Sequence, residues 1–173
     1  LPGGIRRLSD YLTVDREHLP RDYMSRPENL AAYLHFFLPW NIYRQGRLLR
    51  GLDLTLKPGA RLVDLGAGPL TFLHALWLTR PGLREQELDY LAVDRSESAL
   101  KTGLRIFREL APDSRWTIRT DNQPAGARKF QPADLLVMAN FVNEVERAPR
   151  TGRRPTDQGT RRRSGSAHRR LGW

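Results

Sequence analysis

Two glycines and an acidic residue form the part of this sequence best suited to hold a ligand. The run 62–71, LVDLGAGPLT, is an apolar strand pattern that ends near Asp64 and turns through Gly66 and Gly68 into a helix pattern. Glycine adopts positive φ and lets the backbone approach a ligand that a β-carbon would block. A helix over 70–79 would point its unpaired N–H groups into the same space. This strand–turn–helix context predicts a nucleotide-like ligand in an α/β fold.

A carboxylate at the end of each of the first two predicted strands narrows the choice of ligand. Asp64 would repel phosphates but suits an amino or ammonium group, which favours S-adenosylmethionine (SAM) over a dinucleotide. Asp94 ends the strand predicted over 88–93, 26 residues after Gly68, where an acid accepts hydrogen bonds from ribose hydroxyls. Asp94 also suits the N-cap of a helix that begins at Ser96, and the two roles are compatible.

These motifs resemble those of class I SAM-dependent methyltransferases over about residues 26–146. The resemblance is carried by Asp64-Leu65-Gly66-Ala67-Gly68, Asp94 and the run 134–140, DLLVMAN. Within that class, the sequence most resembles the methyltransferase-like proteins associated with the small ribosomal subunit of bacteria and mitochondria. Three runs carry this resemblance: Gly66-Ala67-Gly68-Pro69, Ala92-Val93-Asp94-Arg95-Ser96 and Phe141-Val142-Asn143-Glu144.

The sequence departs from this family at two points. Leu70 stands where a third loop glycine is often found. The later strands, and the cysteine cluster of some members, have no counterpart, so no metal-cluster function is carried over and no metal site is predicted.

The resemblance implies SAM as the cofactor and assigns roles to residues in the loop and at the strand ends. Gly66 and Gly68 would lie against the methionine and ribose parts, with Asp64 near the amino group through water. Asp94 would bind the ribose, and Arg95 would lie against the adenine edge.

Later strand ends complete the predicted cofactor site. Asp121 or Asn122 would contact the adenine amino group, although Asp-Asn is also an ordinary turn pair. Asn140 would face the transferring methyl. The predicted cofactor-binding residues are Asp64, Gly66, Ala67, Gly68, Asp94, Arg95, Asp121, Asn122 and Asn140.

No catalytic residue follows from the sequence. Residues 140–144 read NFVNE and lack the Asn-Pro-Pro-Tyr type of motif that acts on exocyclic amines. The absence of cysteine excludes a cysteine nucleophile. Glu144 could act as a base or be an acid at a helix N-terminus, and His74 is expected to be a packed or surface helix residue.

Strand patterns alternate with helix patterns, which predicts a Rossmann-like, doubly wound, mostly parallel sheet. We expect strands over 61–64, 88–93, 116–120 and 133–139, and helices over 29–37, 39–49, 70–79 and 96–110, with short helical turns near 4–12 and 16–23. The predicted units are a helical extension (1–56), a SAM-binding domain of four strands (57–146), apparently incomplete at its C-terminal end, and a tail (147–173). The aromatic residues of the first two helices are expected to pack over the sheet: Tyr33, Phe36, Phe37, Trp40 and Tyr43.

The net charge of +10 is concentrated in residues 147–173, which hold nine arginines and one acid. Residues 1–146 carry only +2. The tail has no large apolar residue before Leu171, so disorder is expected. Three interpretations stay open: an arm that binds RNA phosphates, a solvated tail without function, or a segment that is not the natural continuation, for example after a frame shift.

Composition limits the remaining possibilities. The absence of cysteine excludes disulfides and suits a cytoplasmic protein, and no apolar run reaches the roughly 18 residues of a membrane span. The resemblance implies a SAM-binding, methyltransferase-like protein that transfers a methyl group from SAM to RNA or acts on the small ribosomal subunit. A non-catalytic ribosome-assembly or RNA-binding factor is the first alternative. An NAD-binding Rossmann protein is the second, disfavoured because Thr71 interrupts Gly-x-Gly-x-x-Gly and an acid ends the first strand.

Overall fold

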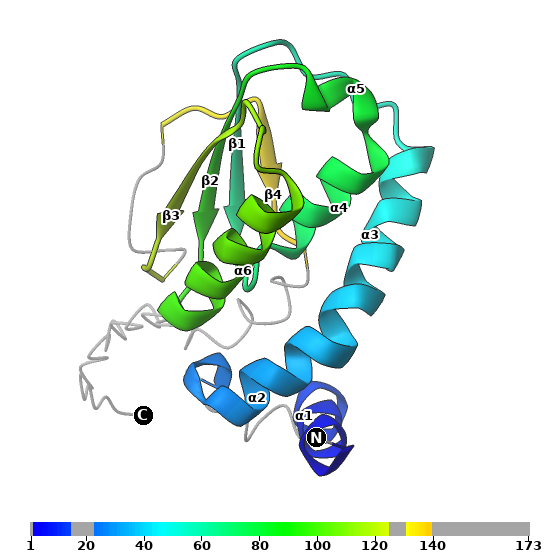
Figure 1. Cartoon of the computed structure of the whole chain (residues 1–173), viewed down its shortest axis with the longest axis vertical. Coiled ribbons are helices and arrows are strands. Elements are labelled where there is room, and N and C mark those ends of the chain that lie inside the picture. The colour runs from blue at the N-terminus through cyan, green and yellow to red at the C-terminus, as the bar shows by residue number, and fades with distance from the viewer. Residues whose placement is uncertain (1, 15–22, 125–130, 140–173) are drawn as a thin grey trace, which may run out of the picture.

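A four-stranded parallel sheet forms the centre of the computed structural model, which describes residues 2–14, 23–124 and 131–139 (Figure 1). The strands are β1 (Ala60–Leu65), β2 (Leu88–Val93), β3 (Thr117–Asp121) and β4 (Leu135–Val137), in the order β3-β2-β1-β4. This confirms the predicted α/β fold with a parallel sheet. The chain order reverses beside β1, and open α/β sheets bind ligands at the carboxyl ends of the strands at such a switch point.

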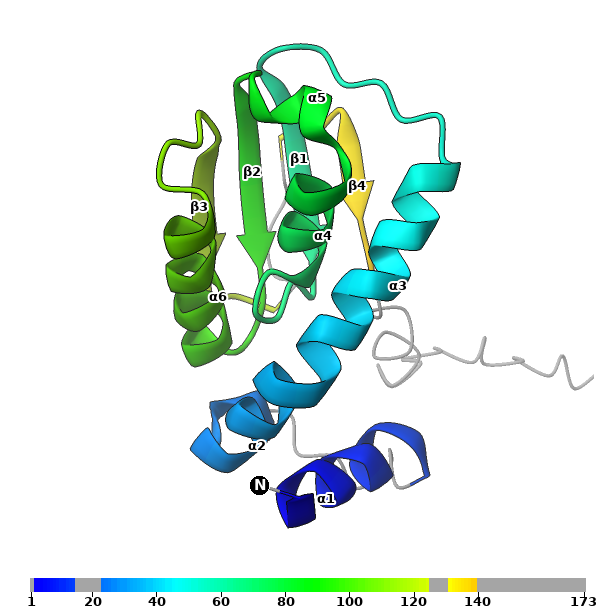
Figure 2. The same ribbon diagram turned by 45° about the vertical axis from the view of Figure 1, so that its right-hand side comes forward.

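The two crossover helices lie on the same face of the sheet (Figures 1 and 2). They are α4 (Thr71–Thr79) and α6 (Glu97–Leu110), and the short α5 (Pro81–Arg84) follows α4. Right-handed β-α-β connections place successive helices on one side in this way. The N-terminal part of the chain adds α1 (Pro2–Thr13), a 3₁₀ turn (Tyr23–Ser25), α2 (Pro27–Ala32), a π-helical turn (Tyr33–Phe37) and α3 (Leu38–Gly51). α3 packs on α4.

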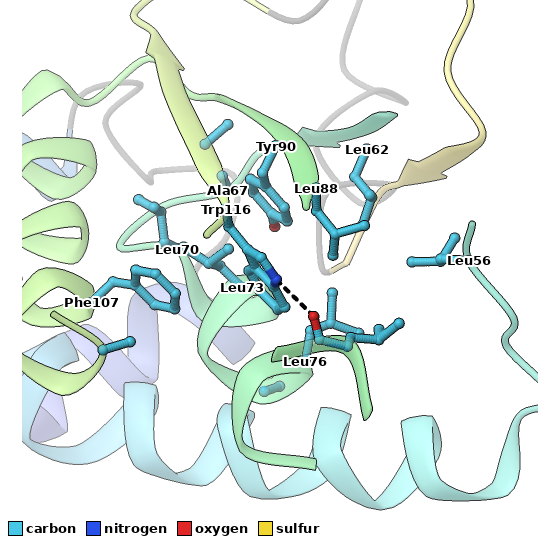
Figure 3. Close-up of a cluster of buried hydrophobic side chains, with 14 of the residues drawn as sticks. Leu56, Leu62, Ala67, Leu70, Leu73, Leu76, Leu88, Tyr90, Phe107 and Trp116 are labelled. Atoms are coloured by element: carbon cyan, nitrogen blue, oxygen red, sulfur yellow. Dashed lines mark hydrogen bonds between the residues drawn. The ribbon is translucent and has the colours of Figure 1, made fainter. Parts of the chain in front are cut away.

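The main hydrophobic core lies between the sheet and these helices (Figure 3). Phe107 of α6 stacks on Trp116 with the ring centroids 6.0 Å apart, and Trp77 of α4 meets both rings edge-on. The buried indole N–H of Trp116 donates to the carbonyl oxygen of Leu83 at 3.0 Å. The opposite face of the sheet carries a smaller buried cluster of Val63, Leu65 and Val93.

The local patterns predicted most elements within two residues of their observed ends. Strand 88–93 has the predicted bounds, and helix 96–110 differs by one residue. The N-cap residue of α2 is Arg26, whose side chain makes no capping hydrogen bond. The predicted turn 4–12 is part of the longer helix α1, whereas most of 16–23 lies outside the described residues.

The helices predicted over 29–37 and 39–49 form one continuous helical rod. A π-helical turn (Tyr33–Phe37) joins α2 to α3 without a break. Pro39 lies in the first turn of α3, where a missing N–H is tolerated. The wider turn immediately before it accommodates the loss of α-helical hydrogen bonding.

The expected packing of the aromatic residues over the sheet is wrong for three of them. Phe36, Trp40 and Tyr43 are each more than half exposed. α3 instead turns Leu49 and the partly buried Ile42 toward the core. Since residues three and four apart share a helix face, the three rings lie on the side that faces away from α4.

Ser96 caps α6, and its replacement with Ala should cost about 1 kcal/mol of stability. The Ser96 hydroxyl accepts a hydrogen bond from the Ala99 N–H at 3.3 Å, and alanine leaves that donor without its partner. Urea unfolding would measure the loss. Thr102→Ala within the same helix is the control and should be neutral or slightly stabilising, because alanine is the better helix former. Equal stability of the two variants would contradict the capping role.

Within the described residues, no helix has the length and apolar character needed to cross a membrane.

Candidate functional site

The glycine-rich loop leaves β1 and is tied to the end of β2. Gly66 and Gly68 have φ of 72° and 53°, which explains glycine at both positions. The N–H groups of Gly66 and Ala67 both donate to the carbonyl oxygen of Val93, at 2.8 and 3.1 Å. These bonds hold the loop over the carboxyl ends of the two central strands.

Open space lies beside Gly68. A β-carbon built there would meet no atom within 4 Å, so the backbone conformation, rather than crowding by the protein, requires glycine. The protein therefore leaves room for a ligand to approach the Gly68 backbone closely.

Leu70, which replaces the expected third glycine, also adopts a left-handed conformation (φ 57°, ψ 42°). This conformation costs a non-glycine residue about 1 to 2 kcal/mol. The side chain of Leu70 is fully buried, and its carbonyl oxygen lies 2.6 Å from Nδ1 of His74. A carbonyl only accepts, so His74 carries its proton on Nδ1 in this contact.

His74 is a buried helix residue, one of the two placements expected from the sequence. Its ring meets Phe107 edge-on, 5.9 Å between centroids. Burial lowers the pKa of His74, against a hydrogen bond with Leu70 that raises it. His74 is thus a neutral support of the loop.

The carboxylate of Asp94 connects the loop to the start of α6. Its Oδ2 accepts from the Gly68 N–H and its Oδ1 from the Ser96 N–H, both at 2.8 Å. Burial raises the pKa of Asp94, while the hydrogen bonds from Ser96 and Gly68 and the charge of Arg95 lower it. An ionised carboxylate has about four acceptor sites, so the Asp94 carboxylate can also accept from a ligand hydroxyl. The N-cap itself is Ser96.

Asp64 lies beneath the loop and is paired with a residue that sequence reasoning missed. The Tyr90 hydroxyl donates to Asp64 Oδ2 at 2.7 Å, and both side chains are almost fully buried. The pKa of Asp64 is raised to about 7: burial has the largest effect, the Tyr90 hydrogen bond lowers the pKa, and the charge of the nearby Asp94 raises it. The parallel register pairs Tyr90 with Leu62, on the same face of the sheet as Asp64, and the sequence alone does not give this register.

The end of β3 joins the same edge through Asn122. Its side-chain amide donates to the carbonyl oxygens of Asp94 (3.1 Å) and Arg95 (2.7 Å). Asn122 therefore uses its donors on the protein backbone and holds the β2–α6 turn. Asp121 is the last residue of β3 and lies opposite Val93 in the strand register. The side chain of Arg95, in the turn after β2, is exposed.

Eight of the nine predicted cofactor residues thus lie at one edge of the sheet: Asp64, Gly66, Ala67, Gly68, Asp94, Arg95, Asp121 and Asn122. Asn140 lies outside the described residues, as do Glu144 and the tail 147–173. The part of the chain that the structure describes contains no group of three or more acidic or histidine side chains placed to bind a metal.

No protein-family model and no curated protein matches this sequence. Among solved structures, the chain is similar to a protein from Methanococcus maripaludis assigned as a SAM-dependent methyltransferase, with 16% identity, a TM-score of 0.46, and 69% of this chain and 51% of that chain covered. It is also similar to a SAM-dependent methyltransferase from Geobacter sulfurreducens in complex with S-adenosyl-L-homocysteine. The identity is 19%, the TM-score is 0.37, and the match covers 76% of this chain and 42% of that chain. A third similar structure is a cyclopropane synthase from Mycobacterium tuberculosis, with 15% identity, a TM-score of 0.38, and 78% of this chain and 40% of that chain covered. The chain spans about half or less of the length of these proteins, and the similarity is one of fold.

Proposed function

We propose that this protein binds SAM at the carboxyl ends of β1 and β2 and acts as a methyltransferase. The observation that carries the proposal is the position of the Asp94 carboxylate, held by the Gly68 N–H beside the open face of the loop. The ribose of a nucleoside would place its hydroxyls against that carboxylate while the rest of the ligand follows the loop backbone.

The second acid favours SAM over a dinucleotide. Asp64 lies below the loop, close enough to Asp94 for the two charges to interact. Asp94, together with an Asp64 carboxyl that is only partly ionised at neutral pH, creates a negative field, which suits a ligand with an ammonium and a sulfonium group and opposes a pyrophosphate. Because Asp64 is only 1% exposed, its effect on the ligand is electrostatic or passes through water.

In this arrangement each residue has a positioning role. Asp94 would orient the ribose, and the loop would leave room for the methionine part above Gly68. SAM supplies an electrophilic methyl group, and alignment of an acceptor with that methyl supplies much of the rate. His74 and Asn122 hold the backbone on either side of this space.

For the methyl acceptor we propose RNA, with the small ribosomal subunit as the partner. The sequence resemblance over about residues 26–146 and the nine arginines of 147–173 support this choice. The alternative is an assembly factor that binds RNA without transferring a methyl group.

Calorimetric titration of S-adenosylhomocysteine, and separately of NAD, into the full chain tests the cofactor. We expect micromolar binding of the first only. Asp94→Ala should weaken it at least tenfold, the worth of about one charge-assisted hydrogen bond. Asp113→Ala, which removes an exposed carboxylate beyond α6, should bind like the wild type. If NAD binds and S-adenosylhomocysteine does not, the proposal fails.

Single-turnover transfer of labelled methyl from SAM to small-subunit RNA then separates the two roles. Transfer that is lost in Asp94→Ala would support the enzyme. Cofactor binding without transfer would favour the assembly factor.

A further inference from the structure

The outer face of α3 and of the π turn before it exposes a row of aromatic rings. Phe36, Trp40 and Tyr43 are 52%, 55% and 52% exposed. Trp40 and Tyr43 are stacked, with their centroids 5.8 Å apart and their planes 27° apart. Contiguous exposed apolar groups of this kind mark interaction sites in soluble proteins.

Among the described residues, α3 packs on α4 through its opposite face. α3 contacts the core through Leu49 and Ile42, and Gly46 lies so close to α4 that a β-carbon would be 2.7 Å from the methyl of Thr79. These residues lie on the side opposite Trp40 and Tyr43 by helical spacing. Polar residues would serve equally well on the outer side, so packing does not explain the rings.

Arginines occupy the same row as the rings. Arg44 and Arg47 are exposed and follow Trp40 by four and seven residues, which places all three on one helix face. No acidic residue occurs between Glu28 and Asp53. The exposed side of α6 is different, because Lys101 there is paired with Glu97 at 2.7 Å. The arginines on α3 have no acid on their own helix, so the row is complementary to an anionic partner.

We propose that this aromatic–arginine face, formed by Phe36, Trp40, Tyr43, Arg44 and Arg47, binds single-stranded RNA. Exposed rings stack with bases, and arginines between them pair with phosphates and also stack. The stretch from Trp40 to Arg47 rises about 10 Å along the helix. The role of this RNA as methyl acceptor rests on the proposed function, but the binding surface does not.

A lipid surface fits this face less well. An interfacial helix separates its apolar face from its basic face. Here Arg44 and Arg47 lie among the rings, so insertion of the rings would carry both charges toward the acyl chains.

The direction of α3 connects this face with the candidate site. α3 begins near the edge of the sheet where the strands end and runs toward the opposite edge (Figure 2). The main-chain carbonyl of Met24, just before α2, accepts a hydrogen bond from Ser98 at the start of α6. A strand bound along α3 would therefore reach the edge that holds the glycine loop and Asp94.

The test is binding of a single-stranded RNA of about twelve nucleotides, labelled with fluorescein for anisotropy and, separately, with 2-aminopurine as a stacking reporter. The full chain is compared with Trp40→Ala/Tyr43→Ala and with Arg44→Gln/Arg47→Gln. The matched control is Leu48→Ala, because Leu48 is 63% exposed on the same helix. Circular dichroism verifies that each variant is folded.

We expect the ring variant to weaken binding at least tenfold, since each stacked base contributes about 1 to 3 kcal/mol. Its salt dependence should stay unchanged, and the 2-aminopurine signal should be lost. The arginine variant should reduce the slope of log K against log salt by about 1.4, or 0.7 per phosphate contact. Leu48→Ala should match the wild type, and residues 147–173 contribute equally to all four proteins.

Three results would overturn the inference. The first is that Trp40→Ala/Tyr43→Ala binds the RNA as tightly as Leu48→Ala does, which would mean that basic residues elsewhere provide the affinity. Another is a dimer in sedimentation that the ring variant dissociates without loss of RNA binding. The last is ring-dependent binding to anionic vesicles with none to RNA. Failure of S-adenosylhomocysteine to bind, with ring-dependent RNA binding retained, would reject the proposed function and leave this surface established.

Discussion

Replacing Asp64 with Asn should stabilise the protein by about 4 kcal/mol above pH 7 and by little near pH 4. The pKa of the Asp64 carboxyl rises from its ordinary value of 3.8 to about 7 in the folded protein, mainly through burial. Between these pH values the unfolded chain has released the proton and the folded protein retains it. The folded state therefore loses stability as pH rises through this range. Asparagine cannot ionise, and its carbonyl can still accept the Tyr90 hydroxyl.

Urea unfolding of wild type and Asp64→Asn between pH 4 and 8 measures this effect. The difference between the two proteins isolates Asp64. His74, whose lowered pKa removes stability as pH falls below 6.5, is present in both. Tyr90→Phe removes the hydrogen bond that lowers the Asp64 pKa, so its pH transition should move upward. If the free energy of unfolding changed with pH in the same way for wild type and Asp64→Asn, the Asp64 carboxyl would not have a raised pKa in the folded protein.

Adding one methyl group at Gly103 should destabilise the protein by about 3 kcal/mol. A β-carbon there would lie 2.4 Å from the carbonyl carbon of Pro69 and 2.5 Å from its oxygen. These are backbone atoms of the glycine-rich loop, which the bond from Gly68 to Asp94 holds in place. Either α6 or the loop must shift, so Gly103→Ala should also weaken binding of S-adenosylhomocysteine.

Gly82→Ala is the matched control, because a β-carbon at Gly82 meets nothing within 4 Å. That substitution should be neutral or stabilise by up to about 1 kcal/mol through the unfolded chain. Thermal and urea unfolding compare the variants, and calorimetry compares their affinities. Equal stability of the two variants would mean that α6 does not press against the loop.

Short-range patterns in the sequence were sufficient for the fold class and for the edge that holds the candidate site. The alternation of residues 88–93 and the Gly66–Gly68 turn each act over a few residues, so their consequences are visible in the chain itself. For the same reason Asp64 and Asp94 could be placed at neighbouring strand ends before the strands were seen to pair.

Features that depend on contacts between distant segments were decided only by the tertiary structure. Leucine has no preference for positive φ, so the turn at Leu70 results from its burial and from the contact with His74. The Tyr90–Asp64 hydrogen bond needs the register between two strands, and the requirement for glycine at 103 arises from the packing of α6 on the loop. Helical spacing placed Trp40 and Tyr43 on one face, but only the docking of α3 on α4 decided that this face is exposed. Local propensity cannot encode such outcomes, because each is the result of two segments competing for the same space or the same partner.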